Sequence, residues 1–171
     1  MKENNVIMME NNEYYDIISD SYDGLHHEEQ ANKIAIIRRE LKPGDDDILL
    51  DLGAGPGYLE LDCTIVRLDP SIRLLKQSKT GYCVLGKAES LPFKDNCFDY
   101  VVSITAMQNF NDIKKALSEI KRVARADSDI IISFLKRSGN ADKITGLIKE
   151  SLDVIRTIEE EKDIILIARN S

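Results

Sequence analysis

Three glycines stand close together at Gly53, Gly55 and Gly57, directly after the apolar run Ile48–Leu52. Glycine lets the backbone turn tightly, and it lets a ligand approach the main chain where any Cβ would collide. Asp69 follows 16 residues after Gly53, at the end of the next apolar run. Nucleotide-binding α/β folds place an acid at that point to accept hydrogen bonds from ribose hydroxyls. The pattern predicts a ribose-binding site, and a plain turn with a solvent-facing Asp69 is the alternative.

The spacing of the glycines distinguishes between ligands. A dinucleotide-binding loop follows the pattern G-x-G-x-x-G, and Tyr58 stands where its third glycine belongs. No Lys-Ser or Lys-Thr pair follows at the spacing of a phosphate-binding P-loop. The loop therefore suits an uncharged sugar with an amino-acid tail better than a pyrophosphate. A nicotinamide-dependent oxidoreductase is disfavoured further, because the chain has no Tyr-x-x-x-Lys pair.

A sheet must position this loop, and apolar runs of strand length alternate with helical patterns along the chain, as in α/β folds. Seven strands are predicted, at Ile48–Leu52, Thr64–Leu68, Tyr82–Leu85, Tyr100–Ile104, Asp129–Phe134, Val154–Glu159 and Asp163–Ala168. Helices are predicted at Tyr14–Tyr22, Glu28–Leu41, Ser71–Lys79, Asn111–Ala124 and Asn140–Leu152. Only residues 160–162 join the last two strands, so we expect an antiparallel hairpin at one edge of a seven-stranded, mostly parallel sheet.

Composition excludes several classes of protein. A chain of 171 residues is long enough for one domain, and its net charge of −7 disfavours direct, unaided binding to nucleic acid. No apolar run approaches the roughly 20 residues of a membrane-spanning helix, and the N-terminal residues do not resemble a signal peptide. The three cysteines have neither CxxC nor Cys/His spacing, which predicts no metal site and no disulfide framework. A cytoplasmic location is expected.

Three ordered stretches carry a family resemblance. Leu50–Gly57 reads L-D-L-G-A-G-P-G, Asp69-Pro70-Ser71 closes the second strand, and Ala88–Asp99 reads A-E-S-L-P-F-K-D-N-C-F-D. Together they resemble the class I S-adenosylmethionine-dependent methyltransferases, specifically the type 11 methyltransferase domain family. The resemblance implies a Rossmann-like three-layer sandwich and S-adenosylmethionine as cofactor. It also implies methyl transfer to an acceptor that the sequence does not identify, whether a small molecule, a tRNA or a protein.

The resemblance also implies roles for single residues. Asp51 would orient the methionine amino end of the cofactor, and Asp69 would hold the ribose hydroxyls. The segment that begins with Ala88 would lie against the adenine, and residues 103–108 would face the methyl group and the acceptor. The implied cofactor-binding residues are Asp51, Gly53, Ala54, Gly55, Gly57, Asp69, Pro70, Ala88, Glu89 and Ser103.

Catalytic candidates are few, because transfer from an activated sulfonium needs alignment and exclusion of water more than it needs a base. Gln108 and Asn109 could hydrogen-bond an acceptor, or could only cap the helix that begins near Asn111. His26 could act as a base, or could be an ordinary surface histidine. The catalytic residues thus stay unassigned.

The N-terminal region has a predicted role of its own. Residues 1–44 are expected to form a helical cap over the cofactor pocket, and residues 45–171 the methyltransferase core, within one domain overall. Tyr14, Tyr15 and Tyr22 would form an aromatic lid over the cofactor, or would brace the sheet.

Two features depart from the family pattern. Lys87 stands where many relatives carry an acid before the Ala-Glu pair, and only residues 58–63 separate Gly57 from the second strand. That interval is too short for the usual first helix, because parallel crossovers take a dozen or more residues. A similarly short crossover occurs in wobble-uridine tRNA methyltransferases that work with a small zinc-binding activator protein. The resemblance therefore suggests a partner-dependent enzyme, and a non-catalytic methyltransferase-like subunit is the alternative.

Overall fold

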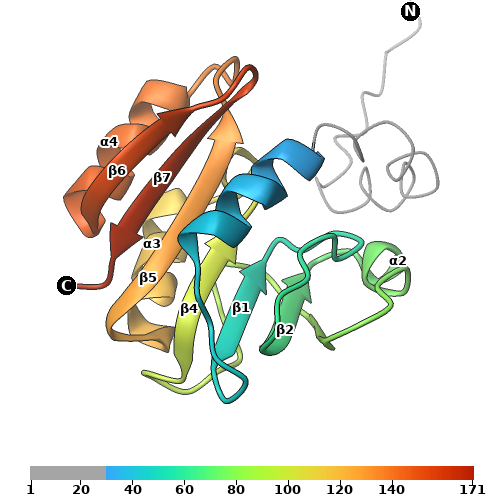
Figure 1. Ribbon diagram of the computed structural model, residues 1–171. Helices are drawn as coiled ribbons and strands as arrows, with labels where there is room; N and C mark the ends of the chain where they lie inside the picture. The colour runs from blue at the N-terminus through green and yellow to red at the C-terminus, as the bar shows by residue number, and fades with distance from the viewer. Residues whose placement is uncertain (1–29) are drawn as a thin grey trace, which may run out of the picture.

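The computed structural model describes residues 30–171, and seven strands within this range form one sheet (Figure 1). The strands are β1 (Ile48–Leu52), β2 (Thr64–Asp69), β3 (Tyr82–Leu85), β4 (Phe98–Ser103), β5 (Ala124–Leu135), β6 (Asp153–Glu159) and β7 (Asp163–Arg169). Their order across the sheet is β3-β2-β1-β4-β5-β7-β6. The first five strands are parallel, whereas β7 is antiparallel to both β5 and β6. The predicted edge hairpin is confirmed.

Helices cover both faces of the sheet (Figure 1). A helix over residues 30–40 crosses one face, and α3 (Ile113–Val123) and α4 (Ala141–Ser151) lie on the other. A short 3-10 helix, η1 (Met107–Asn109), follows β4, and α2 (Ile72–Leu75) follows β2. The fold is therefore the expected Rossmann-like three-layer sandwich. The predicted helix Tyr14–Tyr22, its tyrosines and His26 lie outside the described residues.

Two apolar layers hold the helices to the sheet. On one face the helix over residues 30–40 packs Ile37, which is fully buried, against Leu49 of β1 and Val102 of β4. On the other face Leu117 and Ile120, two of the regularly spaced apolar residues of α3, are fully buried. β1 and β4 are thus covered on both faces, as the apolar run Ile48–Leu52 predicts for β1.

The helix predicted at Ser71–Lys79 is shorter than expected, because it ends at Leu75. The main-chain N–H groups of Gln77 and Ser78 donate to carbonyls only three residues back, so the α-helical pattern is lost there. Gly81, with a φ of 77°, then turns the chain into β3. The helical pattern in the sequence is therefore overridden by the turn that β3 requires.

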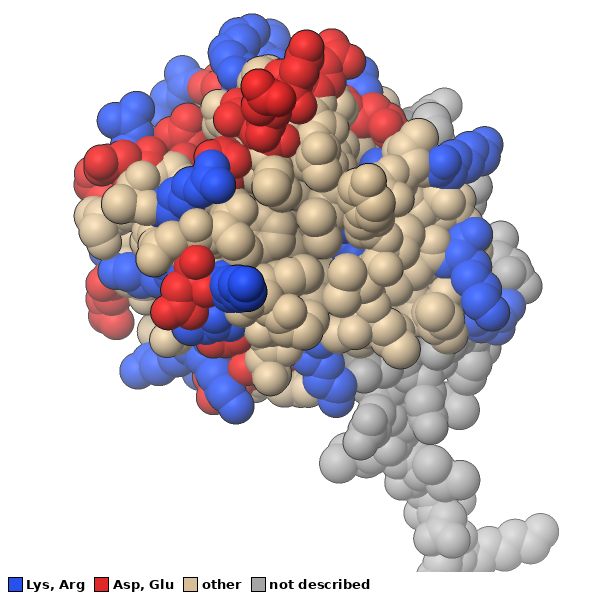
Figure 2. All heavy atoms as spheres, turned by 90° about the horizontal axis from the view of Figure 1, so that it is seen from below, with Lys and Arg blue, Asp and Glu red and all other residues tan. Residues whose placement is uncertain are grey.

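Charge is spread unevenly over one end of the molecule. Figure 2 shows the molecule from the end at which β1 and β4 begin, and uncharged residues cover a broad central area there. Lys and Arg side chains lie around the rim of that area and not across it. This face therefore offers no broad basic surface of the kind that binds a phosphate backbone. Within residues 30–171, no helix combines the length and the apolar character needed to cross a membrane.

Candidate functional site

The glycine loop lies at the carboxyl end of β1, where the order of the strands reverses: β2 lies on one side of β1 and β4 on the other. Open α/β sheets bind ligands in the crevice at such a reversal. The N–H groups of Gly53 and Ala54 donate to the carbonyl of Leu68, at 2.8 and 3.1 Å, and tie the loop to β2. Gly53 has a φ of 71°, and a Cβ there would lie 2.5 Å from the Cβ of Ala106. Only glycine fits this position without displacing the segment after β4.

Asp69 points into the glycine loop and not into solvent. Its Oδ2 accepts a hydrogen bond from the N–H of Gly55 at 2.8 Å, and its Oδ1 accepts one from the N–H of Ser71, also at 2.8 Å. The residue is 6% exposed. The solvent-facing alternative is therefore wrong.

Two recesses share Gly53 as a lining residue. The first is lined by Gln30, Asp51, Gly53, Ala54, Gly55, Pro56, Tyr58, Leu59 and Ile104. The second is lined by Leu52, Gly53, Leu68, Pro70, Lys87, Ala88, Glu89, Asn109, Phe110 and Asn111. Most of the predicted cofactor-binding residues thus gather around two adjoining hollows. Four predicted residues do not line either hollow: Gly57, Asp69, Ser103 and Gln108.

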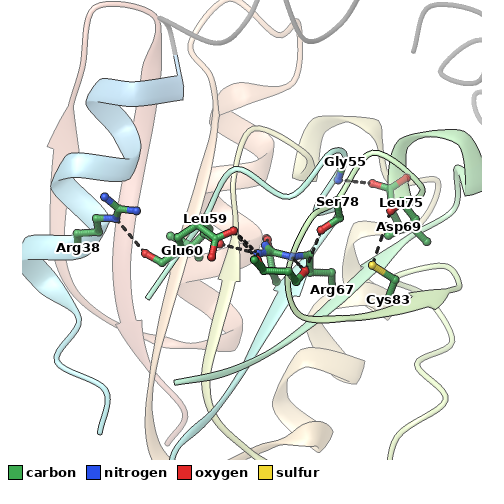
Figure 3. Close-up of polar contacts among 11 residues, drawn as sticks. Arg38, Gly55, Leu59, Glu60, Arg67, Asp69, Leu75, Ser78 and Cys83 are labelled. Atoms are coloured by element: carbon green, nitrogen blue, oxygen red, sulfur yellow. Dashed lines mark hydrogen bonds and ion pairs between the residues drawn. The ribbon is translucent and has the colours of Figure 1, made fainter. Parts of the chain in front are cut away.

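A fully buried arginine lies beneath the short crossover, and the sequence analysis missed it. Arg67, in β2, donates through Nη1 to Asp51 Oδ2 at 3.0 Å and through Nε to the carbonyl of Thr80 at 2.9 Å. Its Nη2 reaches the carbonyl of Leu59 and the carboxylate of Glu60, at 2.9 and 3.1 Å. Figure 3 shows Leu59 and Glu60 directed toward this side chain. The available signal was a charged residue inside an otherwise apolar strand.

The carboxyl group of Asp51 has an unusual environment for an acid. Burial raises the pKa of Asp51 to about 6, and the adjacent Arg67 guanidinium opposes this rise. Asp69 and Glu60 add smaller effects in the upward direction, because their negative charges disfavour a third one nearby. Asp51 therefore changes its charge near pH 6 while it faces the first recess.

Glu89 caps a helix as well as lining the second recess. Its Oε1 accepts hydrogen bonds from the N–H groups of Asn111 and Asp112, at 2.7 and 3.2 Å, just before α3. The side chain of Asp112 in turn accepts from the N–H of Lys115 at 3.0 Å. Capping by Gln108 or Asn109 is therefore wrong, because Asp112 is the N-cap residue.

The segment after β4 carries polar residues with unusual environments. Ser103 is fully buried, and its Oγ makes no hydrogen bond with the described residues. Gln108 donates through Nε2 to the carbonyl of Thr105 at 2.8 Å, while its Oε1 has no hydrogen-bond partner among residues 30–171. Thr105 has a φ of 53°, which is rare for a β-branched residue. Such strained positions cluster at functional sites.

A buried ion pair contacts that strained residue, and no pattern in the sequence indicates this pair. Lys33 Nζ lies 2.5 Å from Asp163 Oδ2 and donates to Thr105 Oγ1 at 2.8 Å. The N–H of Thr105 donates to the carbonyl and the hydroxyl of Ser133, at 3.0 and 2.9 Å. The N-terminal helix, the segment after β4 and the start of β7 therefore meet at the carboxyl end of the sheet.

Comparison with known proteins agrees with this geometry. Residues 50–132 match a family model described as a methyltransferase domain. An uncharacterised protein of Methanocaldococcus jannaschii is 36% identical over 127 residues, which cover 71% of this chain and 50% of that protein. Demethylmenaquinone methyltransferase of Renibacterium salmoninarum is 34% identical over 94 residues, covering 50% of this chain and 40% of that enzyme. The chain spans about half the length of these curated relatives.

The fold is shared with solved structures. One is a chain of the complex between the Haloferax volcanii Trm112 methyltransferase activator and a methyltransferase, with a TM-score of 0.75 and 14% identity. The match covers 95% of this chain and 98% of that chain. At this identity the likeness establishes the fold, while the family model covers the strands that carry the glycine loop and Asp69. The chain belongs to the class I S-adenosylmethionine-dependent methyltransferases, whose cofactor is S-adenosylmethionine.

Proposed function

We propose that this protein transfers the methyl group of S-adenosylmethionine to an acceptor that is a small molecule, a tRNA or a protein. One observation carries the proposal: Asp69 is directed at Gly55, beside two hollows that share Gly53 as a lining residue. The geometry fits the cofactor, because the glycines at 53, 55 and 57 have no Cβ atoms, and main chain of this kind beside a carboxylate suits a ribose. In addition, the buried Oε1 of Gln30, which lines the first recess, makes no hydrogen bond with the described residues.

The proposed residue roles follow from this placement. Asp51 and the loop from Gly53 to Gly57 hold the amino-acid end of the cofactor in the first recess. Asp69 and Pro70 hold the ribose, and Ala88 and Glu89 border the adenine in the second recess. Ser103, which is fully buried at the end of β4, supports the segment that faces the acceptor.

The chain's own contribution to the reaction is alignment. When bound, the cofactor supplies a methyl group already activated by its sulfonium, so a precise approach and exclusion of water provide most of the acceleration. Ala106 closes against Gly53 and keeps water from that part of the main chain. We assign Gln108, whose Nε2 donates to the carbonyl of Thr105, the role of accepting a hydrogen bond from the methyl acceptor through Oε1. Asn109 borders the second recess and has the same capacity.

We also propose that residues 1–44 serve as a cap over the pocket. Gln30, at the start of the described part of the cap, lines the first recess. Lys33, one turn later, donates a hydrogen bond to Thr105, in the segment proposed to face the acceptor. The region therefore contributes to both halves of the site. A cytoplasmic location is proposed from the three free cysteines, Cys63, Cys83 and Cys97, which fit a reducing compartment.

Isothermal titration with S-adenosylmethionine and S-adenosylhomocysteine tests the cofactor assignment. We expect both ligands to bind, and Asp69→Asn to weaken both at least roughly tenfold, since hydrogen bonds to a charged group are among the stronger ones. Asp153→Asn, which changes an exposed acid on β6, is the matched control and should leave both affinities unchanged. Absence of both heat and thermal shift at millimolar ligand in the wild-type protein would refute the proposal.

The acceptor is identified by transfer of a tritiated methyl group to fractionated RNA, protein and metabolites from a cell extract. Label in one fraction selects the acceptor class. The net charge of −7 makes RNA the acceptor that most needs help from a basic partner. Label in no fraction, with the cofactor bound, would favour the non-catalytic alternative.

That alternative is a partner-dependent or non-catalytic subunit, and the edge strand β3 favours it. Tyr82 and Leu85 of β3 are 69% and 58% exposed, and α2 beside them is only four residues long. An open strand edge with apolar side chains suits a partner that extends the sheet. A chain with this fold occurs in a complex with the Trm112 methyltransferase activator. We therefore propose a small activator protein as the partner at β3.

Size-exclusion chromatography of the protein mixed with its host's small zinc-binding activator tests this alternative. Tyr82→Asp should abolish a complex that the wild-type protein forms. Ile155→Asp changes an equally apolar, 53% exposed residue on β6, the opposite edge strand, and should leave the complex intact. A wild-type monomer with full turnover in the presence of the activator would exclude partner dependence.

A further inference from the structure

Arg67 binds the short crossover that lacks the usual first helix. It is fully buried in the middle of β2, directly beneath the short segment 58–63. Each of its three nitrogens is used: Nε by Thr80, Nη1 by Asp51, and Nη2 by Leu59, Glu60 and the hydroxyl of Thr80. The Arg67 side chain thus binds the segment 58–63, which stands in place of a helix.

The register of the sheet brings Arg67 to Asp51. The two residues are Cα partners in the parallel pairing of β1 with β2, so their side chains project from the same face of the sheet. Gly57 leaves the necessary room, because a Cβ there would lie 2.9 Å from Cδ and Nε of Arg67. The glycine loop, the crossover and the acid at the end of β1 are therefore built around this guanidinium.

The first recess contains two oxygen acceptors that suit a cation. Asp51 lines it, and so does Gln30, which is 6% exposed and whose Oε1 makes no hydrogen bond with residues 30–171. Within residues 30–171, the charged groups that act on Asp51 are Arg67, Asp69 and Glu60, and Arg67 is the only cation among these three. Removal of Arg67 would leave Asp51 buried among like charges, which favours its neutral form.

We propose that Arg67 is a positioning residue that fixes the Asp51 carboxylate in its charged form, so that the first recess binds the α-ammonium at the amino-acid end of S-adenosylmethionine. This inference rests on the proposed function. It adds the role of Arg67, which acts on the amino-acid end of the ligand through Asp51 and not on the adenosine end.

Two ligands distinguish binding of the amino-acid end from binding of the adenosine end. S-adenosylhomocysteine carries the amino-acid end, whereas 5′-deoxy-5′-methylthioadenosine has the same adenosine and thioether but lacks it. By isothermal titration at pH 7.5, Arg67→Met should weaken S-adenosylhomocysteine binding roughly tenfold or more, and the second ligand less than about twofold. Arg67→Lys keeps the charge and should recover part of the loss. Arg169→Met removes an exposed arginine at the end of β7 and is the matched control.

A pH series adds a readout that a purely structural role would not change. The ammonium stays protonated between pH 5 and 7.5, so a fall in affinity in this range reports Asp51. Burial raises the pKa of Asp51 to about 6, and binding requires its charged form. Wild-type affinity for S-adenosylhomocysteine should therefore fall as the pH drops through about 6, and in Arg67→Met the fall should begin at a higher pH. Affinity for 5′-deoxy-5′-methylthioadenosine should stay flat, and Asp51→Asn should remove the pH dependence.

The outcomes distinguish the two proposals. If the wild-type protein binds neither ligand, the proposed function fails and this inference fails with it. If the wild-type protein binds both but Arg67→Met and Arg67→Lys weaken both ligands equally, Arg67 is only structural and this inference alone is overturned. Should Arg67→Met not fold, the wild-type and Asp51→Asn pH series still decide, because a pH-independent wild-type affinity for S-adenosylhomocysteine also overturns it.

Discussion

Two arginines on different sides of the molecule hold loops in the same way. Arg67 binds the carbonyls of Leu59 and Thr80 together with two carboxylates, beneath the short crossover. Arg122, in α3, binds the carbonyls of Leu91 and Phe93 together with two carboxylates, and so holds the segment that leads from the second recess to β4. Each guanidinium donates hydrogen bonds to the main-chain carbonyls of segments that form neither helix nor strand.

The two clusters differ in burial, and this reverses the behaviour of their acids. The Arg122 side chain is 31% exposed, and its hydrogen bonds lower the pKa of Glu119. The Arg67 side chain has no exposure, and burial raises the pKa of Asp51 although an arginine touches it. Near water, pairing with an arginine stabilises the charged form of an acid. In the interior, the same pairing only partly offsets the cost of burying that charge. Removing one partner of the buried pair should therefore lower the free energy of unfolding much more than removing one partner of the exposed pair.

The largest expected effect is the loss of Arg67. Arg67→Met leaves Asp51 without its cation and two carbonyls without donors, so we expect the free energy of unfolding to fall by about 3–5 kcal/mol. Urea unfolding followed by circular dichroism measures the change. A loss below about 1 kcal/mol would show that water or another donor reaches the cluster, and the contrast with Arg122 would disappear.

The second effect is the contribution of Asp51 to the pH dependence of the unfolding free energy. Its pKa of about 6 in the folded protein lies above the ordinary 3.8, so the folded state binds this proton more tightly than the unfolded state. The resulting stabilisation is fully present below pH 3.8 and is lost as the pH rises through about 6. The unfolding free energy of the wild-type protein relative to Asp51→Asn should therefore grow by about 2–2.5 kcal/mol between pH 7 and pH 4. A constant difference across that range would contradict the assignment.

Glu119 should change the unfolding free energy with pH in the opposite direction to Asp51, and it serves as the comparison. Its pKa is lowered from the ordinary 4.5, mainly by the hydrogen bond from Arg122, so its stabilisation is present above that pH and is lost as the pH falls. The advantage of the wild-type protein over Glu119→Gln should thus shrink in acid, while its advantage over Asp51→Asn grows.

The sequence predicted what depends on local pattern. Ile48–Leu52 is a central strand because each of its positions is apolar or faces a partner, and the loop after it turns where glycine permits. Arg67 was missed because its partners come from β1, from the crossover and from the turn before β3. Only the pairing of β1 with β2 reveals that Asp51 lies beside it. Lys33 and Asp163 were missed for the same reason, because they meet only when three separate elements pack together.

The third effect concerns the space that Arg67 needs. Gly57→Ala places a Cβ 2.6 Å from Ser78 Oγ and 2.9 Å from Arg67 Cδ, at a φ of +80°, and should cost about 1–3 kcal/mol. Gly146→Ala is the matched control: this glycine lies within α4 with no atom within 4 Å of a new Cβ, so the change should stabilise the protein by about 0.5–1 kcal/mol. Thermal unfolding of both variants, monitored side by side, should give shifts of opposite sign.

The smallest effect tests the exposed cluster. Arg122→Met removes hydrogen bonds to Leu91, Phe93, Asp95 and Glu119, but water can replace the arginine at a partly exposed site, so we expect a loss of about 1 kcal/mol. The two clusters share no residue and lie on different segments, so the effects of Arg67→Lys and Arg122→Met should add to within about 0.5 kcal/mol in the double variant. A larger coupling energy in urea unfolding would mean that the two loops are held as one unit, and the distinction between a buried and an exposed anchor would then describe one network and not two.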